Sequence, residues 1–164
     1  MAQTITCKNE RLTFTASTLG AELQSICSAE GISYLWHGDA SYWGGRAPNL
    51  FPFVGALRNG KAKSAQGEIV LPRHGFGRKA EFAVETVSPE TVTYRLDATE
   101  ETRKAYPYDF SFRVTHSLKE NTLTTVYQVS NTGRYPLPFC VGGHPAFNVP
   151  LVPGEHYEDY RIEF

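Results

Sequence analysis

The sequence predicts an all-β protein built as an antiparallel β-sandwich. Apolar and polar side chains alternate over several segments, which is the pattern of a strand with one face in a core and the other in water. The chain also contains many aromatic residues and turn formers, with 10 Phe, 9 Tyr, 14 Gly and 10 Pro among 164 residues. Frequent turns combined with aromatic side chains are typical of β structure.

The alternation locates the expected strands in order along the chain. Residues 12–16 place Leu12, Phe14 and Ala16 on one face. Shorter candidates cover residues 69–71 and 82–87, and residues 91–97 again alternate, with apolar side chains at every second position. Each of these segments has the two-residue period of a strand that is buried on one side.

The clearest pattern predicts a β-hairpin in the second half of the chain. Residues 110–118 and 123–129 both alternate, and residues 119–121 between them form an expected three-residue turn. Residues 160–164 alternate as well and predict a last strand.

One short helix and two long irregular regions interrupt this pattern. Residues 99–105 begin with Thr99 as an N-cap candidate, carry acids early and bases late, and end before Tyr106-Pro107. Residues 43–60 and 136–153 are rich in Gly, Pro, Asn and aromatic residues. Loops of this length in a compact domain are often functional.

Composition excludes several classes of protein. With a net charge of −1 and a pI near 6.5, the sequence shows no excess of positive charge that would bind nucleic acid or an anionic membrane. We expect no membrane span, no signal peptide, no metal site and no cofactor, and a cytoplasmic location. Cys7, Cys27 and Cys140 form no CxxC pair, so three buried thiols in a reducing compartment are expected.

Two of the five histidines are candidates for chemistry. His74 opens HGFGR and His144 lies in GGHPAFN. Adjacent glycines allow a ligand to approach the backbone, and the aromatic residues that follow, Phe76 and Phe147, could stack on a sugar. Imidazole suits acid–base work near neutral pH. The alternative, equally supported locally, is a turn histidine bonded to a carbonyl.

The other three histidines are expected to have no catalytic role. His116 is in phase with the apolar residues of its strand, so we predict a core histidine. His37 and His156 lie in polar turns or loops.

Four motifs together resemble the aldose 1-epimerase (galactose mutarotase-like) family, in particular its LacX-like branch. In chain order they are GRAPNLFPFVG at residues 45–55, HGFGR at 74–78, YPYDF at 106–110 and GHPAFN at 143–148. The resemblance implies a large antiparallel galactose mutarotase-like β-sandwich, of which residues 1–164 would form a single, incomplete N-terminal domain.

The resemblance also implies a mechanism and a site. Members of the family interconvert the α and β anomers of an aldose by acid–base ring opening, without a metal or cofactor. His144 matches the family's acid, and His74 matches the histidine that holds the substrate and stabilises charge at the ring oxygen. Arg58, Arg78 and Asn148 are the expected substrate-binding residues.

The chain departs from the family pattern in two places. The family's sugar-binding arginine aligns with Ala56, and Arg58 would replace it from the same side of an extended segment. The catalytic glutamate and a substrate-binding aspartate come from a C-terminal part that has no match here, because Glu155, Glu158 and Glu163 are too near His144 in the chain.

These departures leave three functional hypotheses open. The first is an aldose 1-epimerase-like isomerase, impaired without its base. The second is a non-catalytic carbohydrate-binding β-sandwich, and the third is a remnant without a ligand. A small-molecule sugar is the expected partner, and an incomplete sandwich should associate with itself or with a missing C-terminal half. Arg46, Arg58 and Arg78 could hold a phosphate or be solvated surface charges.

Overall fold

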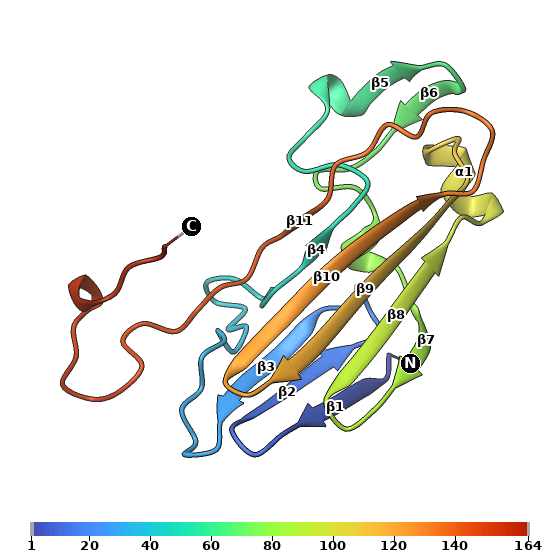
Figure 1. Ribbon diagram of the computed structural model, residues 1–164. Helices are drawn as coiled ribbons and strands as arrows, with labels where there is room; N and C mark the ends of the chain where they lie inside the picture. The colour runs from blue at the N-terminus through green and yellow to red at the C-terminus, as the bar shows by residue number, and fades with distance from the viewer. Residues whose placement is uncertain (1, 164) are drawn as a thin grey trace.

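The computed structural model describes residues 2–163 and shows two antiparallel sheets packed face to face (Figure 1). The smaller sheet has the order β1-β2-β3 and the larger has the order β10-β9-β8-β7. Their strands are β1 (Thr4–Lys8), β2 (Leu12–Ser17), β3 (Leu23–Ser28), β7 (Ala83–Val87), β8 (Thr91–Asp97), β9 (Phe110–Lys119) and β10 (Thr122–Asn131). The predicted all-β sandwich of antiparallel strands is confirmed.

Smaller elements lie beside the two main sheets (Figure 1). Two short strands from distant parts of the chain pair as β4 (Asn49–Leu50) with β11 (Gly142–Gly143). A separate hairpin consists of β5 (Lys61–Ser64) and β6 (Gly67–Val70). The connections include α1 (Glu100–Ala105) and 3-10 turns at Arg58–Gly60, Gly77–Lys79 and Tyr157–Asp159.

The core lies between the two sheets and uses the side chains that the alternation predicted. These buried side chains are Leu12, Phe14 and Ala16 from β2, Val92, Tyr94 and Leu96 from β8, and Phe110, Phe112, Val114, His116 and Leu118 from β9. Phe51, which follows β4, stacks on Phe112 with ring centroids 4.4 Å apart. The sheets are therefore held together chiefly by burial of aromatic and aliphatic surface.

The structure corrects two expectations about local elements. In the β9–β10 hairpin, Lys119 pairs with Thr122, so the turn contains two residues rather than three, and Glu120 takes φ 54°. The predicted last strand is wrong for residues 160–163, which are irregular and follow a 3-10 turn. Phe164 lies outside the described residues.

The one predicted helix is confirmed as α1. The Thr99 side chain accepts a hydrogen bond from the backbone N–H of Thr102, and the Thr102 side chain accepts one from the backbone N–H of Thr99. This reciprocal capping satisfies free donors at the start of the helix. The helix ends at Ala105, ahead of Pro107.

A buried polar network joins the turn after β2 to the opposite sheet. Ala21 is fully buried with φ 49°. Two donors reach its carbonyl: Asn49 Nδ2 at 2.8 Å and His116 Nε2 at 2.9 Å. Asn49 Nδ2 also donates to the Gly20 carbonyl, and Tyr127 Oη donates to Asn49 Oδ1. These bonds satisfy backbone groups that water cannot reach.

His116 is the core histidine that its phase in the strand predicted. It is 1% exposed. Because a carbonyl can only accept, Nε2 carries the proton, and Nδ1 accepts from Thr125 Oγ1 at 2.9 Å. Burial lowers the pKa of His116 from 6.5 to about 4. The ring is therefore neutral at physiological pH.

The two outer strands of the larger sheet differ in how they are protected. β7 is five residues long, has a register shift between Val84 and Thr86, and carries Glu85, which pairs with Arg95 and Arg113. β10 is ten residues long, pairs without a break and contains no charged residue or proline. Long uncharged edges readily pair with further strands.

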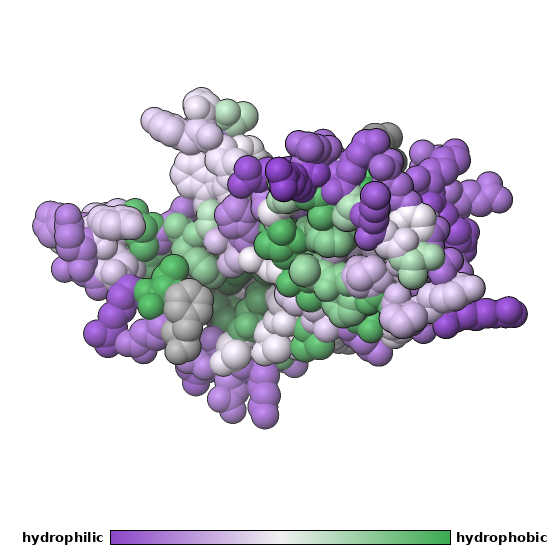
Figure 2. Space-filling view, turned by 90° about the horizontal axis from the view of Figure 1, so that it is seen from above, coloured by the Kyte–Doolittle hydropathy of each residue, from purple (hydrophilic) through white to green (hydrophobic). Residues whose placement is uncertain are grey.

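Apolar side chains also remain at the surface. A groove of about 660 Å³ lies beside β3 and β10, and its lining includes Leu12, Leu23, Ile26, Leu123 and Phe147. Figure 2 shows hydrophobic residues gathered in the middle of the face seen from above, between hydrophilic margins. Exposed apolar surface of this kind is typical of sites that contact another protein, a ligand or a membrane.

Two other expectations can be compared with the structure. Within residues 2–163, no helix has the length and apolar character needed to cross a bilayer. The expectation of three buried thiols is wrong, because Cys7 is buried but Cys27 is only partly buried and Cys140 is exposed.

Replacing Asn49 with Asp should destabilise the chain by about 3 kcal/mol, because two buried carbonyls lose their amide donor and a carboxyl group is buried. Urea unfolding followed by circular dichroism measures the change. Tyr127→Phe, which removes one hydroxyl donor to the same amide, is the control and should cost about 1 kcal/mol. Equal unfolding midpoints for the Asn49→Asp variant and the wild type would contradict this account.

Stability should also depend on pH through His116. Its folded pKa of about 4 lies below the ordinary 6.5, so the unfolded chain binds more protons between these values. The stabilisation is complete above pH 6.5 and is lost as the pH falls to about 4, up to about 3 kcal/mol. Urea unfolding from pH 7 to 4 should show a shallower decline for His116→Gln than for wild type or the exposed-site control His156→Gln. Parallel curves for all three would argue against this role.

Candidate functional site

The two irregular regions that interrupt the strand pattern lie side by side. In the β4–β11 pair, Leu50 lies opposite Gly142 and Asn49 opposite Gly143. Further backbone bonds run from His144 N to the Pro48 carbonyl at 3.1 Å, and from Cys140 N to the Pro52 carbonyl at 2.8 Å. Segments about ninety residues apart in the sequence therefore form one surface.

The glycines before His144 are required by close packing. A Cβ at Gly143 would lie 2.7 Å from Tyr127 Oη, and one at Gly142 would lie 3.1 Å from a methyl group of Val54. Both positions therefore favour glycine, because a side chain there would press on Tyr127 and Val54. His144 follows directly and its side chain is exposed.

The glycine after His74 is required for a similar reason. Gly75 has φ 68°, and a Cβ there would lie 2.3 Å from the Phe51 carbonyl oxygen. The same oxygen accepts a hydrogen bond from Gly77 N at 2.9 Å. The loop that carries His74 is therefore fastened to the backbone just after β4.

His74 is held by a reciprocal pair of bonds with Gly55. The His74 N–H donates to the Gly55 carbonyl at 2.7 Å, and the Gly55 N–H donates to His74 Nδ1 at 3.0 Å. Arg73 Nε lies 3.3 Å from Nε2. A neutral imidazole accepts at one nitrogen only. Because the bond from Gly55 N–H at 3.0 Å is shorter than the Arg73 contact at 3.3 Å, we assign Nδ1 as the acceptor. Nε2 then carries the proton.

The electrostatic surroundings of His74 favour the neutral ring. Burial, followed by the positive charges of Arg73 and Arg78 and the neighbouring His144, lowers the pKa of His74. His74 also has φ 69°, in the left-handed region that a non-glycine residue seldom adopts. Backbone conformations of this kind often occur at functional sites.

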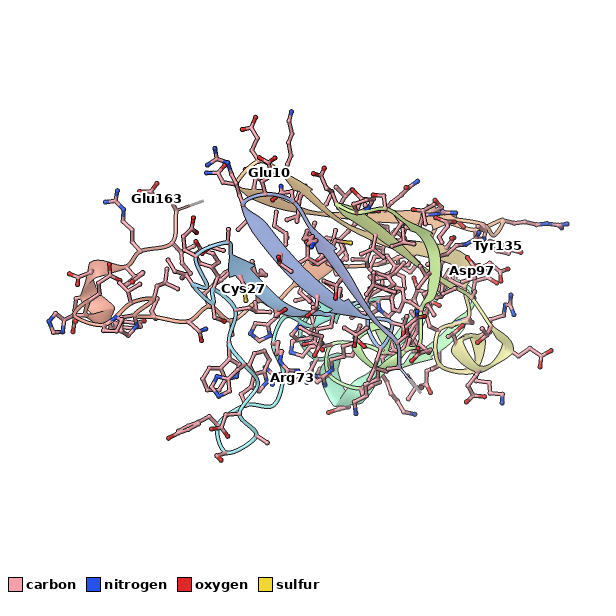
Figure 3. The ribbon with its side chains drawn as sticks, turned by 90° about the horizontal axis from the view of Figure 1, so that it is seen from below. Glu10, Cys27, Arg73, Asp97, Tyr135 and Glu163 are labelled. Atoms are coloured by element: carbon pink, nitrogen blue, oxygen red, sulfur yellow. The ribbon has the colours of Figure 1, made fainter. Side chains whose placement is uncertain are left out.

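The structure brings the two candidate histidines together. Their ring centroids are 6.4 Å apart, and the Trp43 ring lies 5.2 Å from that of His144. In the view of Figure 3, from below, Arg73 and the loop that precedes β4 overlap in projection. Trp43 and Arg73 were not identified from the sequence, although Trp43 stands in an aromatic and glycine-rich region.

The two predicted arginines are placed differently. Arg78 is half-buried beside the His74 loop: one terminal nitrogen donates to the Arg73 carbonyl at 3.4 Å, and its buried Nε has no partner among residues 2–163. Arg58 is exposed in a 3-10 turn. Arg46, considered for phosphate, is instead bonded to the His37 carbonyl and to Gln24.

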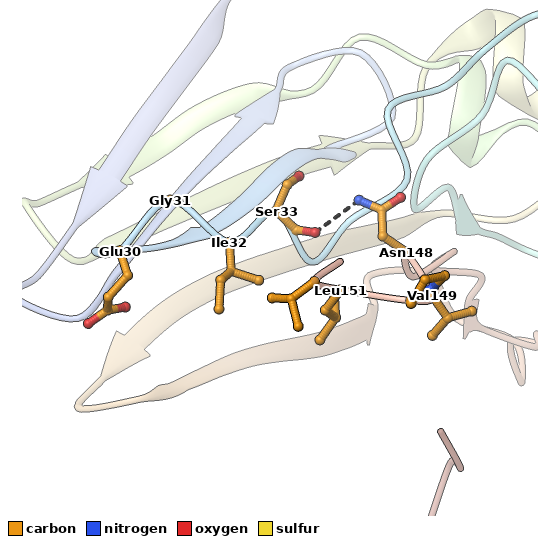
Figure 4. Close-up of a pocket in the computed structure, with 9 residues that line it drawn as sticks. Glu30, Gly31, Ile32, Ser33, Asn148, Val149 and Leu151 are labelled. Atoms are coloured by element: carbon orange, nitrogen blue, oxygen red, sulfur yellow. Dashed lines mark hydrogen bonds between the residues drawn. The ribbon is translucent and has the colours of Figure 1, made fainter. Parts of the chain in front are cut away.

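Asn148 uses its amide to join two segments of the chain. Nδ2 donates to the carbonyls of Ser33 and Leu35, each at 2.9 Å. Figure 4 shows the bond to Ser33 in a hollow of about 490 Å³ that Asn148 lines. Both amide hydrogens are engaged, so only its oxygen is free to bind a sugar, and that role stays a prediction.

The aromatic residues expected to stack on a sugar lie elsewhere. Phe76 packs into the core, with ring centroids 6.0 Å from those of both Phe51 and Phe110. Phe147 is 52% exposed but lines the groove beside β3 and β10. Trp43 instead places its aromatic ring beside His144.

The described residues also limit where a metal could bind. No three His, Cys, Asp or Glu side chains between residues 2 and 163 lie close enough together to hold a metal ion. The groups that shift the pKa of His74 include no carboxylate. Taken alone, the site is a pair of imidazoles with nearby guanidinium groups.

Comparison with known proteins identifies relatives across almost the whole chain. The family model described as aldose 1-epimerase matches residues 3–164. The plasmid-encoded protein LacX of Lactococcus lactis subsp. lactis is 44% identical over 167 residues, covering 98% of this chain and 56% of that protein. The chromosomal LacX of the same organism is 43% identical over the same length.

Two solved structures share the fold. A galactose mutarotase related enzyme from Lactobacillus acidophilus is 40% identical with a TM-score of 0.91, over 96% of this chain and 53% of that one. A galactose mutarotase-like protein from Lactobacillus casei is 34% identical with a TM-score of 0.87, over 92% and 52%.

The chain thus spans little more than half the length of these relatives. The family model covers nearly every residue, and the fold agrees with that of the solved relatives. The chain belongs to the aldose 1-epimerase family and is LacX-like.

Proposed function

We propose that this chain supplies the general acid of an aldose 1-epimerase active site. The observation that carries the proposal is the pairing of His74 and His144, whose ring centroids lie 6.4 Å apart although the residues are 70 positions apart in sequence. Each is held by bonds between backbone groups of distant segments. Such positioning is what proton transfer to a bound substrate requires.

The reaction is the interconversion of sugar anomers. A base removes the proton of the anomeric hydroxyl while an acid protonates the ring oxygen, and the bond from C1 to the ring oxygen breaks. Rotation about C1–C2 and reclosure then produce the other anomer, and both protons return. His144 is the acid, because its imidazole is exposed to solvent and to a bound substrate and its ring lies 6.4 Å from that of His74.

His74 acts as a hydrogen-bond donor to the sugar. The Gly55 N–H occupies Nδ1, so the neutral ring presents Nε2–H. Its lowered pKa keeps the ring uncharged. A neutral donor fits the task of binding the substrate and stabilising negative charge at the ring oxygen as it develops.

Binding of an aldose without catalysis is the second candidate. It is favoured by the surroundings of His74, where burial and three basic groups shift the pKa but no carboxylate contributes. In this reading Arg58, Arg78 and Asn148 help hold the sugar and no base is needed. We retain these three residues as proposed sugar ligands in both cases.

Replacing His144 with Ala should remove any acceleration of mutarotation by the chain. Loss of a general acid typically lowers the rate by about 100-fold or more. Polarimetry of freshly dissolved α-D-glucose and α-D-galactose measures the rate. The control is His156→Ala, an exposed histidine outside the site, which should behave as wild type.

The outcomes separate the two candidates. Acceleration by wild type and by His156→Ala, but not by His144→Ala, supports the epimerase. Without acceleration, sugar-induced shifts of the His74 and His144 ring signals in NMR spectra support binding alone. No acceleration and no shifts would overturn both.

We further propose that the uncharged edge of β10 pairs with a second copy of the chain. Replacing Val126, which is 51% exposed on β10, with Lys should reduce self-association because a charged edge resists strand pairing. Light scattering over a range of protein concentrations measures it. Val87→Lys, on the already protected β7 where Val87 is 59% exposed, is the matched control. A monomeric wild type would rule out the second copy.

A further inference from the structure

We propose that Trp43 forms the wall of the site on which the apolar face of the sugar stacks. This inference rests on the proposed function, because it places an aldose beside His144. A pyranose ring exposes C–H groups on its faces and hydroxyls around its rim. A site that recognises it needs an aromatic surface for the face and polar groups for the rim.

Trp43 is next to the polar groups already described. Its ring centroid is 5.2 Å from that of His144, with the two planes inclined by 38°. His144 is in turn 6.4 Å from His74. The indole is partly exposed and its imidazole neighbour is exposed, so both rings can reach the same ligand.

The loop holds Trp43 in a defined position. Its N–H donates to the Asp39 carbonyl at 2.8 Å, and its carbonyl accepts from Trp36 Nε1 at 2.9 Å. The Asp39 carboxylate accepts from Ser41 N at 2.8 Å, which closes the turn. A rigid aromatic side chain binds a ligand with little loss of conformational entropy.

Gly45 makes room for the indole. A Cβ on Gly45 would lie 2.5 Å from Trp43 Cζ2. The indole therefore folds back over its own loop and lies against His144. The neighbouring Tyr42 differs, because it is 84% exposed and its ring contact is with Trp36.

A purely structural role accounts less well for these contacts. Aromatic residues that stabilise this fold are buried among other apolar rings, as Phe51 is against Phe112. Trp43 instead leaves part of its ring in solvent and packs on a polar, titratable ring. An aromatic ring in this setting is suited to binding a ligand that is partly apolar and partly polar.

The test compares sugar affinity among variants of the full chain. D-Galactose and D-glucose are titrated by NMR into wild type, Trp43→Ala, Trp43→Tyr and Tyr42→Ala. Trp43→Ala should weaken binding about tenfold, equivalent to about 1.4 kcal/mol. Trp43→Tyr, which keeps an aromatic face, should recover most of the affinity, and Tyr42→Ala should bind as wild type.

A second measurement avoids any effect of substitution on folding. Because Trp36 and Trp43 are the two tryptophans of the chain, labelling with 5-fluorotryptophan gives two fluorine signals. Added sugar should shift the Trp43 signal and leave that of Trp36 nearly unchanged.

Failure of this inference differs from failure of the proposed function. If sugar shifts the His74 and His144 signals but leaves the Trp43 signal and the affinity of Trp43→Ala unchanged, Trp43 is not the stacking wall although the site binds sugar. If wild type shows no response to either sugar, both proposals are overturned.

Discussion

The turn between β2 and β3 imposes the constraint on which much of this structure depends. It buries the carbonyl groups of Gly20 and Ala21, where water cannot satisfy them. Asn49 and His116 supply the missing donors. In doing so they join the smaller sheet to β4 and β9. Because β4 pairs with β11, the bonds that satisfy this turn also help determine where His144 lies.

On the other side of the site, backbone groups also fix the position of a histidine. The reciprocal bonds between His74 and Gly55 place one imidazole, and contacts of Gly75 and Gly77 with Phe51 place its loop. Phe51 itself is buried on Phe112. The position of each histidine is therefore connected to the aromatic core through only a few residues, which explains how the exposed His144 and the partly exposed His74 are held in fixed positions.

The sequence predicts β2, β8, β9 and β10 because apolar and polar side chains alternate in them, and it predicts α1 because capping is local. The strands β1, β3 and β5 were not predicted. The sequence does not predict features that depend on contacts between distant parts of the chain. Nothing local distinguishes Phe76, which packs in the core, from Trp43, which contacts His144. The alternation of residues 160–163 does not make a strand, because a strand also requires a partner. His74 and His144 were found from motifs and family resemblance, but their separation depends on the β4–β11 pairing, which no periodicity encodes.

The bond from Gly55 N–H to His74 Nδ1 also limits how protons can move through the site. An imidazole relays a proton when one nitrogen accepts it and the other releases it. The lone pair of His74 Nδ1 already accepts a hydrogen bond from a backbone amide, so this ring cannot pass a proton from one nitrogen to the other. In the proposed function, His144 is therefore the imidazole that exchanges protons between solvent and sugar, and the two histidines have different roles.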